Sequence, residues 1–229
     1  MDKDGQLTFS DDPLLNGINE VYQFIESGNF AGAVEKLDIL MNIDPDYPGL
    51  IEGYRTARFW NNREKELNAL QDGKDTADFL MKQWKIFEEY AYEKDITKST
   101  SYSAVMKYIF FKASEHYKIS FKKQEGNTNN FDLLLNLGDC FLRLKEYKNT
   151  VETLEYARNS YKSSARLLSI LGEAYYHLQD IPKCLLYFRE AFFINPSEIE
   201  LSMIQAKPII LEYYNIRGDV VFYELINDF

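Results

Sequence analysis

One spacing constrains this sequence more than any other feature: residues of the same kind recur 34 positions apart in its second half. Gly138 and Gly172 show this offset. Five further pairs share it: Leu134 and Leu168, Leu137 and Leu171, Phe141 and Tyr175, Leu154 and Phe188, and Ala157 and Ala191. A match of six pairs at one offset indicates an internal repeat, and a period of this length is typical of a stacked array of helices.

Each repeat is predicted to be two antiparallel helices joined by a tight turn. The first segment begins at Asp12-Pro13, an N-cap followed by proline at the first helical position. Ser27-Gly28-Asn29 interrupts the apolar pattern, and Asp44-Pro45 ends it, because a residue before proline is pushed out of the α region. The same unit returns at 131–161 and 165–194. Strand and hairpin signals are nearly absent, so the predicted fold class is all-α.

The repeated residue types indicate how the helices pack. Small residues stand where the two helices of one hairpin approach closely, and large apolar residues fill the space between successive hairpins. One hairpin cannot bury both of its faces, so hairpins are expected to stack.

The period, the helix-turn-helix unit and the residue classes resemble the tetratricopeptide repeat (TPR) family. The best repeat, 165–198, carries the signature residues Leu168, Leu171, Gly172, Tyr175, Phe188, Ala191 and Pro196. Cys184 stands where the family usually has Ala, and repeat 131–164 departs from the pattern at Thr150. The third recognisable repeat is 14–47. The resemblance implies a right-handed superhelix, an α-solenoid of antiparallel helix pairs, with 1–229 as a single TPR-like domain of about six pairs.

The pattern degenerates in two places. Residues 48–130 read as long helices, one starting at Pro48, one near Asp75 and one over 103–122. Because helices of a solenoid alternate between two layers, either the Pro48 helix splits at Asn61-Asn62 or the repeat register is lost there. The C-terminal residues 198–229 read as a further hairpin of capping helices. A capping box at Ser197-x-x-Glu200 marks the start of this hairpin, and Arg217-Gly218-Asp219 is its turn.

Charge and composition exclude several classes of protein. The chain has 26 Lys and Arg against 36 Asp and Glu, a net charge of -10, which disfavours general binding of nucleic acid. No apolar run approaches the length of a membrane span, and the polar first residues do not form a signal peptide. Two cysteines are too few for a disulfide framework. The expected location is the cytoplasm.

Few residues offer catalytic or metal-binding chemistry. His116 and His177 are far apart in the sequence and have no ligand set at local spacing. Cys140 and Cys184 both fall on packing positions, where a buried thiol is an ordinary core residue. There is no phosphate-binding loop or dinucleotide fingerprint. We therefore expect no catalytic residues, no metal and no cofactor.

Aromatic residues concentrate between residues 76 and 121, which contain eleven of them. One interpretation is that long irregular helices need bulky side chains to fill the gaps between them. The other is that Tyr108-Ile109-Phe110-Phe111 covers too much of one helix for a one-sided core, so part of it meets a partner.

The resemblance also implies a partner-binding surface, because the first helix of each repeat in the family faces a concave ligand groove. The corresponding residues here are Asp132, Leu135, Asp139, Arg143, Arg166, Ser169, Glu173, Tyr176 and His177. Family members that hold a C-terminal carboxylate use Lys and Asn at such positions. Since this sequence has three carboxylates among them, we expect a protein or peptide partner of mixed or basic character, not an acidic C-terminal tail.

Three functional hypotheses follow. The first is a non-enzymatic scaffold or adaptor for protein–protein interaction that supports assembly of a larger complex. The second is a structural subunit that self-associates, or packs in an assembly, through its aromatic-rich middle. The third, an enzyme or its regulatory domain, has the least support from the residues.

Overall fold

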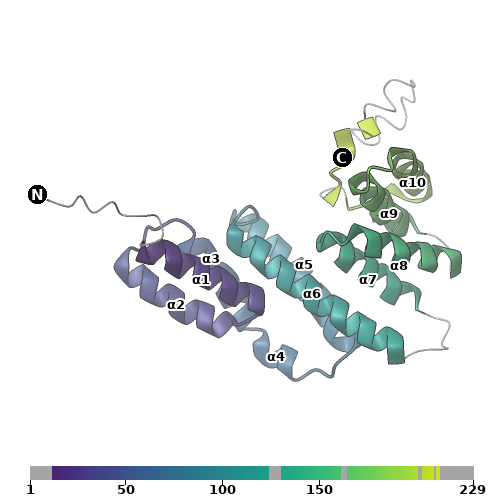
Figure 1. Ribbon diagram of the computed structural model, residues 1–229. Helices are drawn as coiled ribbons and strands as arrows, with labels where there is room; N and C mark the ends of the chain where they lie inside the picture. The colour runs from purple at the N-terminus through teal and green to yellow at the C-terminus, as the bar shows by residue number, and fades with distance from the viewer. Residues whose placement is uncertain (1–11, 124–129, 161–163, 201–202, 209, 212–229) are drawn as a thin grey trace, which may run out of the picture. The chain divides into compact units, whose positions relative to one another are not determined.

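All elements that the structure describes are helical. The computed structural model describes residues 12–123, 130–160, 164–200, 203–208 and 210–211, and these residues contain helices and no strand (Figure 1). The prediction of an all-α helical-repeat fold is confirmed. The chain divides into two compact units, Met1–Ile119 and Ser120–Phe229, which are described in turn.

The first unit begins with the predicted helical hairpin, α1 (Pro13–Ser27) and α2 (Phe30–Ile43). Asp12 is the N-cap, and its Oδ1 accepts hydrogen bonds from the backbone N–H groups of Leu14, at 2.9 Å, and Leu15, at 3.3 Å. Gly28 ends α1 in the left-handed conformation, with φ of 79°. Asp44 ends α2 in extended backbone just before Pro45. Local sequence signals therefore placed both ends of this hairpin correctly.

The middle of the chain contains four helices rather than three. These are α3 (Leu50–Asn61), α4 (Glu64–Asn68), α5 (Lys74–Glu93) and α6 (Thr100–Lys123). The split at Asn61-Asn62 is present, although α4 is only one turn long. Two boundaries differ from the prediction. Helix α3 begins after Gly49, whose φ is 90°, and α6 begins three residues early because the Ser99 hydroxyl oxygen accepts the N–H of Tyr102.

Bulky aromatic side chains fill the space between these long helices. The ring of Trp84 on α5 lies 5.0 Å from that of Phe110 and 5.4 Å from that of Tyr102 on α6. Trp84, Phe87 and Phe110 are buried. Tyr108 packs edge-on against Phe30 of α2, with ring centroids 5.4 Å apart. The interpretation of the aromatic cluster as core is thus confirmed for these residues, and α6 contacts neighbours on more than one side.

The second unit contains the two clearest repeats. Its helices are α7 (Phe131–Arg143), α8 (Tyr147–Ser160), α9 (Ala165–His177) and α10 (Ile181–Ile194), followed by the short 3₁₀ helix η2 (Pro196–Glu198). Gly138 lets α7 approach Leu154 of α8, and Gly172 lets α9 approach Phe188 of α10. A Cβ atom at Gly172 would lie 2.8 Å from Phe188 Cδ2. The 34-residue offset therefore has its physical cause in two equivalent helix contacts.

The predicted capping box at Ser197 is wrong. Asn195 caps η2 instead, and its Oδ1 accepts the backbone N–H of Ser197 at 3.2 Å. Glu200 does not return to a helix N-terminus, because its carboxylate contacts α7. The predicted turn at 217–219 lies outside the described residues.

Candidate functional site

The predicted groove residues lie together on α7 and α9, the first helices of the two clear repeats. Their exposure differs from one residue to the next. Asp132 is exposed, Arg166, Tyr176 and His177 are half-buried, and the others are buried: Leu135, Asp139, Arg143, Ser169 and Glu173. We call the side of α7 and α9 that carries these residues the inner face.

Asp139 is the centre of a buried ion network on this face. Its Oδ1 accepts a hydrogen bond from Arg143 Nε at 3.2 Å, and its Oδ2 accepts one from Arg166 Nη2 at 2.7 Å. Arg166 also donates to Asn136 Oδ1 at 3.1 Å. The side chains of Asp139 and Arg143 are only 6% and 4% exposed. A carboxylate this deeply buried needs such partners, since desolvation of an unpaired charge is costly.

Glu173 is the second buried carboxylate, one helix away. Its Oε1 accepts the backbone N–H of Gln205 at 2.9 Å, and its Oε2 accepts that of Ala206 at 3.2 Å. His177 Nε2 lies 3.2 Å from Oε1. Burial raises the pKa of Glu173, while the two backbone N–H groups and His177 act in the opposite direction. Glu173 therefore holds main chain of a later part of the chain as well as the His177 side chain.

A later part of this same chain supplies the backbone N–H partners of Glu173 and a second carboxylate for Arg143. We call residues 199–200, 203–208 and 210–211 the C-terminal segment. Arg143 Nη2 donates to Glu200 Oε1 at 2.8 Å and to Oε2 at 3.0 Å. Ile199, Ala206 and Ile210 of the segment are buried. The C-terminal segment thus covers part of the inner face.

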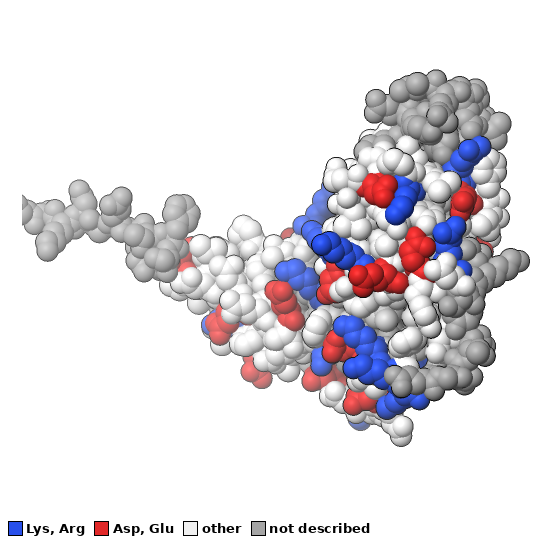
Figure 2. Space-filling model, turned by 45° about the vertical axis from the view of Figure 1, so that its right-hand side comes forward, with Lys and Arg blue, Asp and Glu red and all other residues white. Residues whose placement is uncertain are grey.

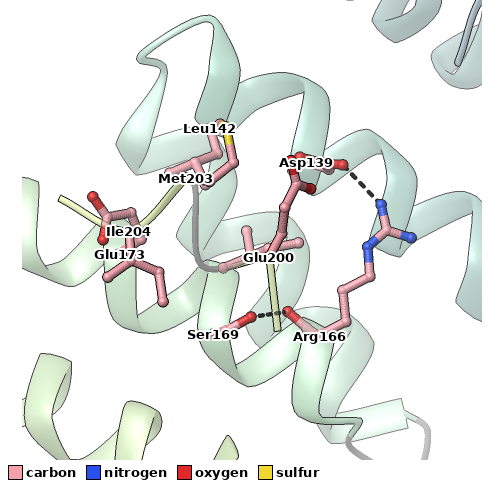
Figure 3. Close-up of a pocket in the computed structure, with 9 residues that line it drawn as sticks. Asp139, Leu142, Arg166, Ser169, Glu173, Glu200, Met203 and Ile204 are labelled. Carbon is pink, nitrogen blue, oxygen red and sulfur yellow. Dashed lines mark hydrogen bonds and ion pairs between the residues drawn. The ribbon is translucent and has the colours of Figure 1, made fainter. Parts of the chain in front are cut away.

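A small cavity remains between the inner face and the C-terminal segment. Its volume is about 30 Å³, and three segment residues, Glu200, Met203 and Ile204, line it (Figure 3). The other lining residues are Asp139, Leu142, Arg166, Ser169, Ile170 and Glu173. A cavity of this size has room for about one or two water molecules and not for a side chain of a further ligand. A partner segment could reach these residues only if the C-terminal segment moved away.

Sequence reasoning missed the residues that complete this site. Glu200, Gln205 and Ala206 lie outside the repeats. The i,i+4 spacing of Asp139 and Arg143 was a usable signal for their pairing on one helix. No local signal connects Glu200 to a residue 57 positions earlier.

The other candidate groups from the sequence are the two cysteines and His116. In the described part of the chain, no group of three His, Cys, Asp or Glu residues could hold a metal ion. Cys140 and Cys184 are buried thiols outside any disulfide, and burial raises the pKa of both, that of Cys184 to about 12. His116 Nδ1 accepts the backbone N–H of Gly73 at 3.3 Å.

The charged side chains of the described residues are of both signs on the surface. On the face shown in Figure 2, acidic and basic side chains of the described residues are interspersed, and no broad patch has one sign. None of the helices over the described ranges combines the length and the apolar character that crossing a bilayer requires.

The comparisons with known proteins found a distant likeness to a solved structure. No protein-family model matches the chain, and no curated protein matches it. A solved structure titled MamA MSR-1 C2 matches with a TM-score of 0.34 and 12% sequence identity, over 81% of this chain and 98% of that chain. A likeness this distant carries no argument about partner or function.

Proposed function

We propose that this chain is a TPR-like, non-enzymatic scaffold or adaptor of the cytoplasm that binds a partner protein and supports assembly of a larger complex. The partner-binding residues in this proposal are those of the inner face: Asp132, Leu135, Asp139, Arg143, Arg166, Ser169, Glu173, Tyr176 and His177. No cofactor or metal takes part.

One observation carries the proposal: the inner face already holds a stretch of polypeptide that is not a regular helix of the repeat. It holds this stretch by a carboxylate that accepts two consecutive backbone N–H groups and by an arginine that donates to a carboxylate. Main-chain hydrogen bonds give affinity for an extended segment, and side-chain contacts select its sequence. These are the chemical means by which a protein binds a peptide.

The alternative function, a structural subunit that associates through the aromatic-rich middle, has a separate observation in its favour. Tyr92 on α5 is 81% exposed and Phe111 on α6 is 53% exposed, whereas Trp84, Phe87 and Phe110 on the same helices are buried. Exposed aromatic side chains are common at the centres of protein interfaces. A mass that increases with concentration, and decreases again in a Tyr92→Ser variant, would favour this function.

The test of the adaptor function is affinity capture from native extract with two matched variants. Arg166→Ala removes a half-buried charge of the inner face, and Lys148→Ala removes an exposed charge on α8. Both variants lose one positive charge, and circular dichroism checks that both remain helical. We expect the wild type and the Lys148→Ala variant to capture a partner protein that the Arg166→Ala variant does not capture.

Two other outcomes are informative. A partner retained by both variants would contradict the inner-face proposal and move the interface elsewhere on the chain. A mass that depends on concentration, with no captured partner, would make the structural-subunit alternative the better account.

A further inference from the structure

The C-terminal segment contacts the inner face at fixed spacing, and this spacing describes what the face can bind. The first contact is a carboxylate, Glu200, which accepts hydrogen bonds from Arg143. Five and six residues later, the N–H groups of Gln205 and Ala206 point to Glu173. The inner face therefore contacts one acidic side chain and then two consecutive main-chain N–H groups.

Packing adds two requirements further along the segment. Ala206 is completely buried, so only a small side chain fits at the sixth position after the acidic residue. Ile210 is 1% exposed, so the tenth position must be apolar. The position of Gln205, by contrast, is exposed and takes any residue that has a backbone N–H.

The charges of the inner face agree with this description. Asp139 and Glu173 were expected to repel an acidic ligand. Asp139 is, however, paired with both Arg143 and Arg166, and Arg143 keeps a further donor for Glu200. Glu173 accepts from main chain and from His177. The repulsion is thus neutralised within the face, and one carboxylate is a favourable ligand for it.

Parts of the C-terminal segment are only loosely packed against the inner face. The side chain of Glu200 remains 46% exposed, and a cavity of about 30 Å³ lies beneath Met203 and Ile204. Gln205 and Pro208 of the segment are also exposed, and local opening costs least where buried contacts are few. By comparison, α9 and α10 pack along their whole lengths, with Gly172 in close contact with Phe188.

We propose that the C-terminal segment is a built-in competitor on the inner face, and that the partner bound there is a protein segment of the same chemistry. That chemistry is an acidic residue, a small residue six positions later and an apolar residue four positions after that. The inference rests on the proposed adaptor function, for which it names the class of partner and the step that controls its binding. A partner segment binds when it displaces the C-terminal segment, so its apparent affinity falls with the fraction of chains that are closed.

The experiment measures binding of a fluorescent peptide with the sequence of residues 196–211 to the full-length chain. Three forms of the chain are compared: the wild type, Glu200→Lys and Glu198→Lys. Glu200→Lys places a cation against Arg143 and opens the face. Glu198→Lys is the matched control, because Glu198 is an exposed residue whose carboxylate bonds to Asn195 and not to the inner face. Thermal unfolding followed by circular dichroism checks that the helical core of each variant is intact.

We expect the peptide to bind Glu200→Lys about tenfold or more tightly than it binds the wild type, since a charge-assisted hydrogen-bonded pair no longer holds the competitor. Glu198→Lys should behave as the wild type. Peptides that carry Glu200→Gln or Ala206→Leu should bind the open chain at least about tenfold more weakly, because they lose the carboxylate or overfill the small site.

Three results would overturn the inference. The peptide could bind none of the chains, or it could bind all three equally, which would mean that the segment does not compete. Alternatively, the wild type could form dimers that the peptide dissociates, which would assign the inner face to the segment of a second copy. If the peptide binds no chain while Arg166→Ala still loses the captured partner, this inference fails and the adaptor function stands. If that partner is also retained, both fail.

Discussion

Arg143 and Glu200 are separated by 57 residues in the sequence and joined by two hydrogen bonds, of 2.8 and 3.0 Å, from one guanidinium nitrogen to both carboxylate oxygens. The same arginine donates from Nε to Asp139, one helical turn earlier on α7. Arg143 is therefore a link between a buried repeat helix and the end of the described chain. This link explains why the inner face is both charged and inaccessible.

Replacement of Asp139 by alanine should destabilise the chain strongly. The substitution leaves Arg143 buried with Glu200 as its remaining carboxylate and removes the partner of Arg166. Breaking a buried ion pair in this way costs about 3–5 kcal/mol. Urea unfolding followed by circular dichroism measures the loss in the free energy of unfolding.

The control for this change is Asp132→Ala, which alters an exposed carboxylate in the first turn of the same helix. It should change stability by less than about 1 kcal/mol. Equal effects of the two substitutions would contradict the network. For the same reason, charge reversal at Asp139 and Glu173 is expected to unfold the second unit, so it is unsuitable as a test of binding.

Gly172→Ala should destabilise the second unit by about 1–3 kcal/mol, the usual cost of overpacking a core. The added methyl would lie 2.8 Å from a ring carbon of Phe188, and the ring belongs to a buried side chain with little room to move. Gly53→Ala is the control, since its Cβ would be 3.3 Å from a Leu37 methyl group and alanine favours the helix. A melting temperature for Gly172→Ala at or above that of the wild type would show that the repeat contact is looser than described.

The two thiols should be protected in the native chain. Burial raises the pKa of Cys140 and of Cys184, so very little reactive thiolate is present at neutral pH. With an aromatic disulfide reagent at neutral pH, labelling should be slow in buffer and rapid, at two thiols per chain, in concentrated denaturant. Rapid labelling of the native chain would show that α7 or α10 opens readily.

Acidification should destabilise the first unit through His116. Burial is the main cause that lowers its pKa below the ordinary 6.5, with Lys112 acting in the same direction and Asp72 and Glu115 opposing. The unfolded chain therefore binds the proton more readily, so His116 contributes stability that is complete above about pH 6.5 and is lost as the pH falls through its lower folded value. Protonation also removes the acceptor of the Gly73 N–H.

The measurement is the difference in unfolding free energy between about pH 7.5 and pH 5, for the wild type and for His116→Gln. The variant should lose less stability than the wild type on acidification. An identical loss in both chains would mean that other groups account for the pH dependence.

Much of this fold follows from short-range sequence signals. Asp12, Gly28 and Pro45 mark the ends of α1 and α2 through hydrogen bonds and backbone angles that involve neighbours in the chain. Where a local signal competed with a charge far away in the sequence, the sequence was less decisive. Ser197 and Glu200 fit a capping box, yet the charge of Arg143 on α7 engages Glu200 instead.

The sequence by itself determined the helical repeat and the side of each helix on which Asp139 and Glu173 lie, because a period of 34 residues fixes the position of every residue within its hairpin. Only the tertiary structure decided that this side is covered. The covering residues have no repeat register, and their hydrogen bonds to Glu173 use backbone N–H groups, which every residue except proline possesses. Such contacts leave no pattern in the sequence, so the occupant of the inner face becomes visible only when the chain is folded.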